Sequence, residues 1–199
     1  MADISLDDVK KLKELTGVGL TDAKTALVEA QGDFDKALTA MRKKGLTRAE
    51  KKGEREARQG LVDSYVHANR IGVLVEVNCE TDFVARTEDF KNLVHDVAMH
   101  IAASAPEYIS TDDVPVDVRQ AKQAEFAEKV KNDGKPEHMV SQIVGGMLQK
   151  YFAEKCLLDQ PFVKNPDQTV GDLVKEHIAR LGENIVVRQF KRVELGVSE

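Results

Sequence analysis

The sequence has little of what several kinds of binding site require. It contains no tryptophan, and aromatic residues make up 5% of its 199 residues, so a surface that stacks nucleic-acid bases is not expected. Its two cysteines, Cys79 and Cys156, show neither zinc-ligand spacing nor a disulfide-rich pattern. We therefore expect both to be small apolar residues of a protein in the reducing cytoplasm.

An excess of basic residues and a long apolar run are also missing. Lys and Arg number 29 against 34 Asp and Glu, which gives a formal net charge of −5. A protein that binds duplex nucleic acid usually carries a basic excess, so no direct nucleic-acid partner is expected. No apolar run approaches the roughly 20 residues of a membrane span, and the start, MADISLDDVKK, lacks the apolar segment of a signal peptide. These features predict a cytoplasmic protein without membrane attachment.

Residues that could carry catalysis or hold a metal are sparse. We find no nucleophile with a base at suitable spacing, and His67 has no second histidine or cysteine at ligand spacing. His95 and His100 are five residues apart on a predicted helix, so they face different sides. Gly145 and Gly146 lack the lysine and hydroxyl pair of a phosphate-binding loop, which leaves close helix packing as their predicted role. The sequence favours a non-enzymatic binding protein with no metal site.

Residues 1–45 contain three short patterns that are typical of helices. Ser5 is expected to cap the first helix and Thr21 the second, because hydroxyl side chains accept hydrogen bonds from free backbone N–H groups at helix starts. Asp33 is expected to start the third helix and Gly45 to end it. The pattern predicts a small three-helix bundle.

A bundle of this size has only a small core, which would be marginal alone. Residues 46–59, LTRAEKKGEREARQ, are nearly all charged or small, and we interpret them as a linker or a solvated helix. We therefore predict a helical domain over residues 1–54, with its charged linker reaching about residue 59, and a larger domain over residues 55–199.

The remaining residues mix strand and helix patterns without βαβ alternation. Residues 60–79 form two alternating runs joined by HANRIG, which predicts an antiparallel hairpin. In its second strand one face carries Ile71, Val73, Val75, Val77 and Cys79. Helices are expected at about 87–105, 117–132, 136–155 and 169–181, with Thr87 and Thr169 at the start of the first and last of them and Gly182 at the end of the last. The first of these helices has an apolar stripe that is expected to be buried: Phe90, Leu93, Val94, Val97, Ile101 and Ala102. In the last strand, 184–195, one face carries Ile185, Val187, Gln189, Lys191 and Val193. These elements predict an α+β fold with a small antiparallel sheet.

The segment between the hairpin and the next helix, NCETDFVARTEDF, places an acid beside a large aromatic residue. Two interpretations are open from the pattern alone. In the first, Thr81 or Asp82 caps a short helical turn and Phe83 packs on the protein's own core as a hydrophobic staple. In the second, Asp82 and Phe83 point outward and enter a cleft of a partner.

Several long motifs, in order and across essentially the whole chain, resemble bacterial elongation factor Ts in its short form. They are LKELTGVGLTDAKTALVEAQGDFDKALTAMRKKG, YVHANRIGVLVEV, EVNCETDFVA, AMHIAASAPEYIS, QPFVK and GENIVVRQFKRVEL. The resemblance implies a guanine-nucleotide exchange factor that binds elongation factor Tu in its GDP-bound and nucleotide-free forms and needs no cofactor. It also implies that the N-terminal bundle is similar to a ubiquitin-associated domain.

The resemblance further implies roles for individual residues. The TDFV motif is complete at Thr81, Asp82, Phe83 and Val84. In the family its acid and aromatic residue enter between helices beside the nucleotide and magnesium site of the partner, which disturbs that site and promotes GDP release. His67, in YVHANRIG, is similar to a histidine of longer members that approaches the same place.

Docking of the N-terminal bundle on the partner is implied for Lys13, Val18, Gly19, Leu20 and Thr21. Lys13 stands where longer members carry arginine before the TGxG turn, and it keeps the charge without the planar bidentate contact of arginine. Leu20 and Thr21 stand where some members carry two methionines, and threonine offers less apolar area. From the pattern alone, a contact inside the bundle is the favoured interpretation of Leu20.

Longer members hold the TDFV and YxHGxRIG segments in two similar subdomains, whereas this chain has one copy of each, with Ala68 in place of the glycine. We infer a homodimer in which one subunit presents the TDFV motif and the other presents His67. The open face of the sheet, with Ile185, Val187 and Val193, is the expected dimer surface.

Other functions make different predictions. A ubiquitin-associated-type adaptor, whose core only dimerises and which lacks exchange activity, would bind its partner even without Asp82 and Phe83. An RNA- or ribosome-bound module would show steep salt dependence, which the negative net charge disfavours. A hydrolase would need a nucleophile and a base, which we do not find.

Overall fold

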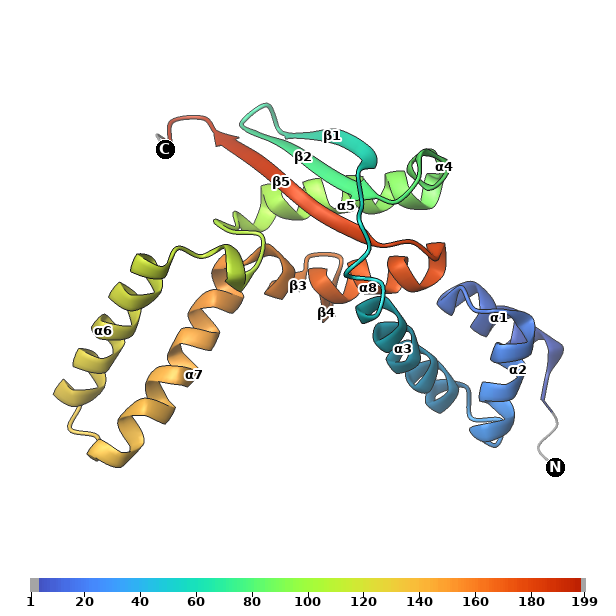
Figure 1. The fold of residues 1–199 in the computed structure, drawn as a ribbon, viewed down its shortest axis with the longest axis horizontal. Coiled ribbons are helices and arrows are strands. Elements are labelled where there is room, and N and C mark those ends of the chain that lie inside the picture. The colour runs from blue at the N-terminus through green and yellow to red at the C-terminus, as the bar shows by residue number, and fades with distance from the viewer. Residues whose placement is uncertain (1–3, 198–199) are drawn as a thin grey trace.

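The computed structural model of the protein describes residues 4–197, apart from the side chains of residues 46–48 and 50. Figure 1 shows a small sheet above packed helices, with two helical arms that extend from this body in different directions. The predicted α+β fold with an antiparallel sheet is confirmed. The domain boundary at residue 54 stays a prediction, and residues 1–3 and 198–199 of the predicted domains lie outside the described part of the chain.

The first arm is the predicted bundle of three helices, α1 (Leu6–Thr16), α2 (Leu20–Glu29) and α3 (Phe34–Glu50). The expected caps form at two of them. The Ser5 hydroxyl accepts from the backbone N–H of Asp7, and the Asp33 carboxylate accepts from that of Lys36. A separate cluster of buried side chains holds the bundle together: Val9, Leu12, Ala23, Ala26, Leu27, Ala37 and Met41.

Two predicted helix boundaries are wrong. The N-cap of α2 is Gly19 and not Thr21, because the extended backbone at Gly19 already starts the helix at Leu20. The third helix passes through Gly45 and ends at Glu50, because it packs along α8 (Val170–Leu181), where a Cβ at Gly45 would lie 3.3 Å from that of Ala179. Tertiary packing thus offsets the low helix propensity of glycine.

The first residues of the predicted linker, 46–50, therefore belong to the third helix. Ala49, in the last turn of α3, is 1% exposed and belongs to the main core rather than to the bundle core. Residues 51–55 form turns before the first strand begins at Gln59. The bundle is thereby joined to the body through a packed contact as well as through the chain.

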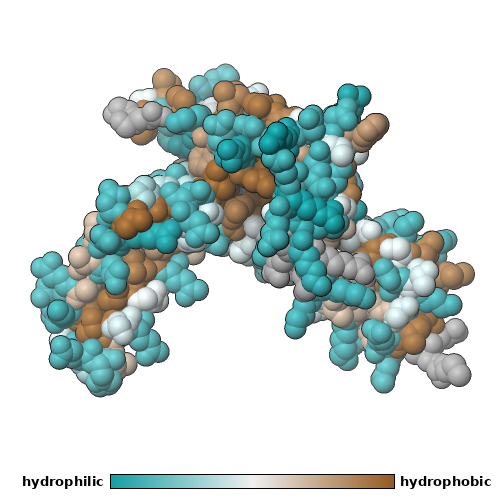
Figure 2. Space-filling view, viewed as in Figure 1, coloured by the Kyte–Doolittle hydropathy of each residue, from teal (hydrophilic) through white to brown (hydrophobic). Residues whose placement is uncertain are grey.

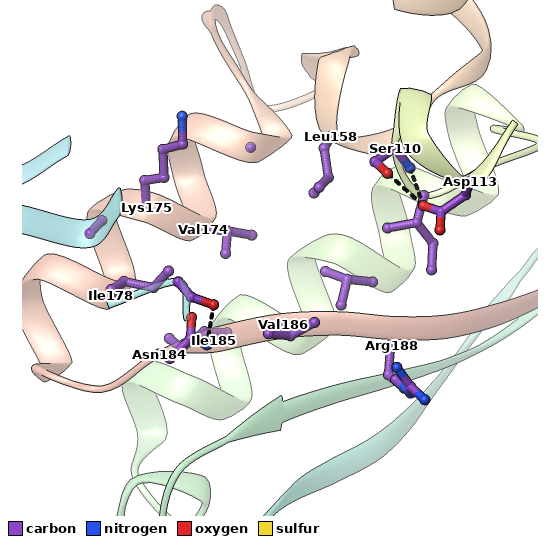
Figure 3. Close-up of a pocket in the computed structure, with 15 residues that line it drawn as sticks. Ser110, Asp113, Leu158, Val174, Lys175, Ile178, Asn184, Ile185, Val186 and Arg188 are labelled. Atoms are coloured by element: carbon purple, nitrogen blue, oxygen red, sulfur yellow. Dashed lines mark hydrogen bonds between the residues drawn. The ribbon is translucent and has the colours of Figure 1, made fainter. Parts of the chain in front are cut away.

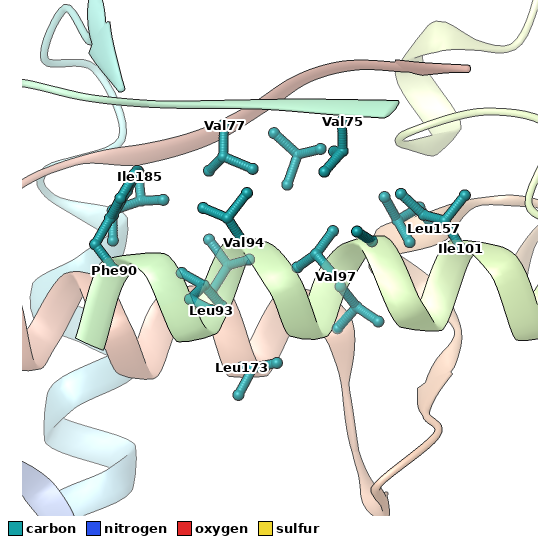
Figure 4. Close-up of a cluster of buried hydrophobic side chains, with 14 of the residues drawn as sticks. Val75, Val77, Phe90, Leu93, Val94, Val97, Ile101, Leu157, Leu173 and Ile185 are labelled. Carbon is teal, nitrogen blue, oxygen red and sulfur yellow. The ribbon is translucent and has the colours of Figure 1, made fainter. Parts of the chain in front are cut away.

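The sheet has three antiparallel strands in the order β1 (Gln59–His67), β2 (Ile71–Cys79) and β5 (Ile185–Glu194). The predicted hairpin and the predicted inward face of its second strand are both confirmed. Helix α5 (Glu88–Ser104), capped by Thr87 as predicted, covers that face. Figure 4 shows Val75 and Val77 pointing from the sheet toward Val94 and Val97 of the helix. The predicted apolar stripe of α5 is buried throughout: Phe90, Leu93, Val94, Val97, Ile101 and Ala102.

A β-bulge interrupts the last strand. Val187 pairs with Val77, but Gln189 pairs with Glu76, the residue immediately before Val77, so Arg188 is an extra residue on β5. A bulge of this kind reverses which side chains face the core along the rest of a strand. The predicted alternation therefore holds only for the first half of β5.

The predicted composition of the open sheet face is consequently wrong in part. Ile185 and Val187 are 3% and 5% exposed and belong to the core under the sheet. Val193 is exposed as predicted. The register places it on the open face together with three apolar residues of the hairpin, Val62, Val66 and Leu74.

The second arm is a hairpin of two helices, α6 (Val116–Asn132) and α7 (Glu137–Lys155), which pack on each other. Within this fully described arm, Val130 and Val144 are the buried residues. Figure 2 shows apolar side chains along the arm, between the sheet and the helices, and in the N-terminal bundle. The arm is therefore stabilised mainly by contacts between its own two helices.

Two glycines inside α7 permit a stability prediction. A Cβ placed at Gly145 or Gly146 would meet nothing within 4 Å, so their predicted role in close helix packing is wrong. An exposed glycine inside a helix costs about 0.5–1 kcal/mol relative to alanine. We expect Gly146→Ala to raise the free energy of unfolding by about this amount in urea titrations followed by circular dichroism. An unchanged or lower stability would contradict the open environment of this position.

Gly17 provides the opposite control for the same titration. It ends α1 with φ of 66°, and a Cβ there would lie 2.4 Å from Cγ of Arg180. Because both the backbone angle and the space exclude a side chain, Gly17→Ala is expected to destabilise the protein.

The remaining elements close the body below the sheet. They are the 3-10 turns Thr111–Asp113 and Leu157–Asp159, the short strands β3 (Pro161–Phe162) and β4 (Asn165–Thr169), and α8. Thr169 caps α8 and Gly182 ends it in the left-handed region, as predicted. His95 is exposed beside Asp63 and His100 is fully buried against Gln160, which confirms that they face different sides. Among residues 4–197, no helix is both long and apolar enough to span a bilayer.

Candidate functional site

The TDFV segment, Thr81–Val84, lies where β2 leaves the sheet and forms a one-turn helix, α4 (Asp82–Ala85). The Thr81 hydroxyl accepts a hydrogen bond from the backbone N–H of Val84 at 3.4 Å, so Thr81 caps the turn. The Phe83 side chain is 79% exposed. The interpretation that Phe83 packs on the protein's own core as a hydrophobic staple is therefore wrong. Of that interpretation, only the helix cap at Thr81 is confirmed.

The neighbours of Phe83 hold the turn in place. Ala85 is buried and Val84 packs against the main core, so one side of the turn is attached to the body while Phe83 points away from it. Arg86 donates a hydrogen bond to the Asp82 carboxylate at 2.7 Å. Both side chains of this pair are substantially exposed, and exposed ion pairs contribute little to stability. Asp82 can therefore exchange Arg86 for another partner at small cost.

A carboxylate from a distant part of the chain anchors the start of the TDFV segment. Oε2 of Glu183 accepts hydrogen bonds from the backbone N–H groups of Glu80 at 3.1 Å and of Thr81 at 3.0 Å, and Oε1 accepts from the Thr81 hydroxyl at 2.6 Å. The Cys79 thiol donates to the Thr81 carbonyl from the other side. Glu183 belongs to the motif GENIVVRQFKRVEL, but the sequence indicates no role for it, since its only signal is a polar position between a helix end and a strand start.

His67 lies apart from the TDFV segment. It ends β1 beside the hairpin turn, is exposed, and has its Nδ1 3.2 Å from the Tyr65 hydroxyl. The TDFV segment follows the opposite end of β2, and nine strand residues separate the two ends, a span of about 25 Å. Ala68, in the place of the glycine of the motif, adopts φ of 48°, a left-handed angle that glycine adopts more readily. One chain thus brings the four TDFV residues together and leaves His67 far from them.

The residues with an expected docking role surround the turn between α1 and α2. Lys13, Gly19, Leu20 and Thr21 are exposed, and Leu20 is 51% exposed, which excludes the interpretation that it is a contact inside the bundle. Val18 is half-buried and packs on the bundle core. The turn therefore presents one charged and one apolar side chain on a backbone supported by Val18.

Known proteins are similar to this chain over most of its length. The model of the family described as Elongation factor TS matches residues 43–197. The chain is 53% identical over 194 residues to the elongation factor Ts of Moorella thermoacetica, covering 97% of this chain and 96% of that protein. It belongs to the elongation factor Ts family.

Other relatives extend the match over the same length. The elongation factor Ts of Caldanaerobacter subterraneus subsp. tengcongensis is 51% identical over 194 residues, with 97% of each chain covered. That of Thermodesulfovibrio yellowstonii is 46% identical over 196 residues, with 98% of each chain covered. These alignments include the N-terminal bundle, most of which precedes the match to the family model. The similarity therefore covers nearly the whole chain, and the protein is a translation elongation factor.

A hollow of about 410 Å³ lies elsewhere in the protein, between α8, β5 and residues 109–113. Figure 3 shows apolar side chains such as Val174 and Ile178 on its walls, with Lys175, Arg188 and Asp113 also lining it. Its lining comes from elements other than α4 and the hairpin turn. The hollow is therefore separate from the TDFV segment and from His67.

Neither cysteine is suited to nucleophilic chemistry. Burial raises the pKa of the thiols of Cys79 and Cys156 to about 11, so neither is a nucleophilic thiolate at neutral pH. Among the residues whose side chains the structure describes, no group of three or more His, Cys, Asp or Glu residues is placed to hold a metal ion. The surface of the protein presents an exposed Phe83 beside Asp82, on a turn that contacts of Thr81, Val84 and Ala85 hold in place.

Proposed function

We propose that this protein is a guanine-nucleotide exchange factor for elongation factor Tu, acting in the cytoplasm by binding and without chemistry of its own. The observation that carries the proposal is the position of Phe83. It is a large apolar side chain, 79% exposed, on a turn that the body of the protein holds in place. A side chain of this kind at a fixed place on the surface is typical of an interaction site.

The proposed mechanism is differential binding. The factor binds nucleotide-free elongation factor Tu more tightly than the GDP-bound form, and linkage requires that it weaken GDP binding by the same factor. Phe83 enters between helices of the partner and contributes roughly 1.5–3 kcal/mol if fully buried there. Asp82 exchanges Arg86 for groups of the partner and disturbs the coordination of its magnesium ion. Because that ion bridges phosphate oxygens, its displacement loosens GDP.

The N-terminal bundle docks on the nucleotide-binding domain of the partner in this proposal. Leu20 supplies apolar contact area and Lys13 supplies a positive charge, while Val18, Gly19 and Thr21 shape the turn that presents them. The exposure of Leu20 supports this role, because an apolar side chain at an exposed turn gains stability only when a partner covers it.

The proposed function is tested by the release of a fluorescent GDP analogue from elongation factor Tu, followed in time with and without the full chain. We expect strong acceleration that saturates as the factor concentration rises. If the folded wild-type protein binds elongation factor Tu but leaves the release rate unchanged, the exchange function is excluded and the adaptor function is favoured.

We further infer that the working form is a homodimer. One subunit presents its TDFV segment, and the other presents His67, since about 25 Å separate the two within one chain. The open face of the sheet, with Val62, Val66, Leu74 and Val193, is the surface that we assign to the dimer contact. It combines exposed apolar side chains from all three strands, as self-complementary two-fold interfaces require.

A charge at the centre of this face tests the dimer. Leu74 lies on the middle strand, and Leu74→Lys is expected to weaken dimerisation by tenfold or more, about 1.4 kcal/mol or above, because the interface would bury an unpaired ammonium group. Light scattering over a dilution series measures the change, with Val116→Lys on the second arm as an exposed control. A wild-type protein that is monomeric at working concentration would exclude the dimer.

A further inference from the structure

The helix that carries Phe83 needs support from outside itself. α4 has four residues, and a single helical turn is unstable alone because nucleation costs more than its few hydrogen bonds return. Its direction must therefore be set by contacts with the rest of the protein. Val84 and the buried Ala85 supply such contacts through the main core, and at the N-terminal end the contacts are those of Thr81.

Glu183 satisfies the groups at the N-terminal end. It accepts three hydrogen bonds, two of them from backbone N–H groups that precede the helix. Hydrogen bonds to a carboxylate are roughly twice as strong as those between neutral groups. The Thr81 hydroxyl donates to Glu183 and at the same time accepts from Val84. The carboxylate thus fixes the orientation of the very hydroxyl that caps α4.

We propose that Glu183 is a positioning residue for nucleotide exchange. Its carboxylate holds Thr81, and through Thr81 it sets the direction in which Asp82 and Phe83 enter the partner. This inference rests on the proposed exchange function and adds to it a residue that never contacts the nucleotide site.

Residues 182–184, the turn that carries Glu183, also hold the segment that follows the N-terminal bundle. The backbone N–H of Asn184 donates to the Glu80 carboxylate at 2.6 Å, and Glu80 also pairs with Arg55. The Asn184 side chain is buried and donates hydrogen bonds to the backbone carbonyls of Gly53 and Arg55. A dashed line in Figure 3 marks the hydrogen bond to Gly53. Residues 182–184 therefore tie the TDFV segment to the exit of the bundle.

The experiment separates positioning from a merely structural role. We compare the wild type with Glu183→Ala and Glu183→Gln in the fluorescent GDP assay, and determine both the release rate at saturating factor and the half-saturating concentration. Glutamine has the size of glutamate, but it presents an NH2 group to one set of donors, so it removes part of the anchor without leaving a void. It therefore keeps the test valid if the alanine variant fails to fold.

Asp113 provides the matched control. Its carboxylate accepts from the backbone N–H and the hydroxyl of Ser110 at 2.9 and 2.6 Å, so it anchors a capped turn much as Glu183 does, but in front of the second arm. Asp113→Ala should change thermal stability by a similar amount and leave the exchange rate at saturation unchanged.

We expect Glu183→Ala to lower the saturating release rate by about tenfold, the effect of losing a charged hydrogen-bond partner, with less change in half-saturation. In a Phe83→Ala background the same substitution should have a much smaller effect, because only the part of the action of Glu183 that passes through Asp82 remains. An undiminished saturating rate for Glu183→Ala, or a loss no larger than that of Asp113→Ala, would overturn the inference, while acceleration by the wild type would keep the exchange function. Equal losses in the presence and absence of Phe83 would overturn it too.

Discussion

Replacing Phe83 by alanine is expected to slow GDP release from elongation factor Tu by roughly 10- to 100-fold at saturating factor. The estimate follows from the apolar area that the ring would bury in the partner, roughly 1.5–3 kcal/mol, since 1.36 kcal/mol corresponds to a tenfold change in rate. Within its own chain Phe83 is 79% exposed, so its loss removes few contacts of the folded state. Stopped-flow measurements with a fluorescent GDP analogue give the rate, and thermal unfolding gives the stability.

Val163→Ala is a suitable control for this experiment. Val163 is also an exposed apolar residue, at 45%, but it lies by the turn between β3 and β4. We expect this variant to match the wild type in both measurements. Equal acceleration by the wild type and by Phe83→Ala would leave the exchange function in place and remove Phe83 from its mechanism.

Replacing Phe90 by alanine should instead lower the free energy of unfolding strongly. Phe90 is 0% exposed in the main core, and Figure 4 shows it at the start of α5 below Ile185. Truncation of a buried phenylalanine costs about 3–5 kcal/mol, through lost apolar burial and the cavity left behind. A domain of ordinary stability has about 5–15 kcal/mol in total, so much of the free energy of unfolding would be lost.

Urea unfolding at equilibrium measures the effect of Phe90→Ala, with Phe83→Ala as the matched phenylalanine seven residues away. We expect Phe83→Ala to change the free energy of unfolding by less than about 0.5 kcal/mol, as exposed substitutions usually do. A loss below about 1 kcal/mol for Phe90→Ala would show that α5 is not packed against the sheet as described.

Local pattern was a good guide wherever one side of an element is buried along its whole length. The alternation in β2 predicted its inward face, and the spacing of apolar residues in α5 predicted its buried stripe, because both periods follow from backbone geometry. Cap residues such as Ser5, Asp33, Thr87 and Thr169 were predicted for a similar reason. Their hydrogen bonds join residues two or three positions apart and need no tertiary contact.

Periodicity failed where a tertiary contact changes the local pattern. The bulge at Arg188 sends Ile185 and Val187 into the core, although a regular strand would place them on the same face as Val193. The third helix continues through Gly45 because α8 lies beside it. Neither effect leaves a mark in the nearby sequence.

The amino-acid sequence alone was sufficient for the α+β class, the hairpin, most of the helices and membership in a family of translation elongation factors, because these depend on local periods and on motifs that run along the chain. Only the tertiary structure decided that Phe83 is exposed, that His67 lies at the far end of the hairpin, and that Glu183 anchors Thr81. These facts depend on which segments meet in space, and Glu183 and Thr81 are separated by 102 positions in the chain. The direction of the Phe83 side chain thus follows from a contact that no nearby residue encodes.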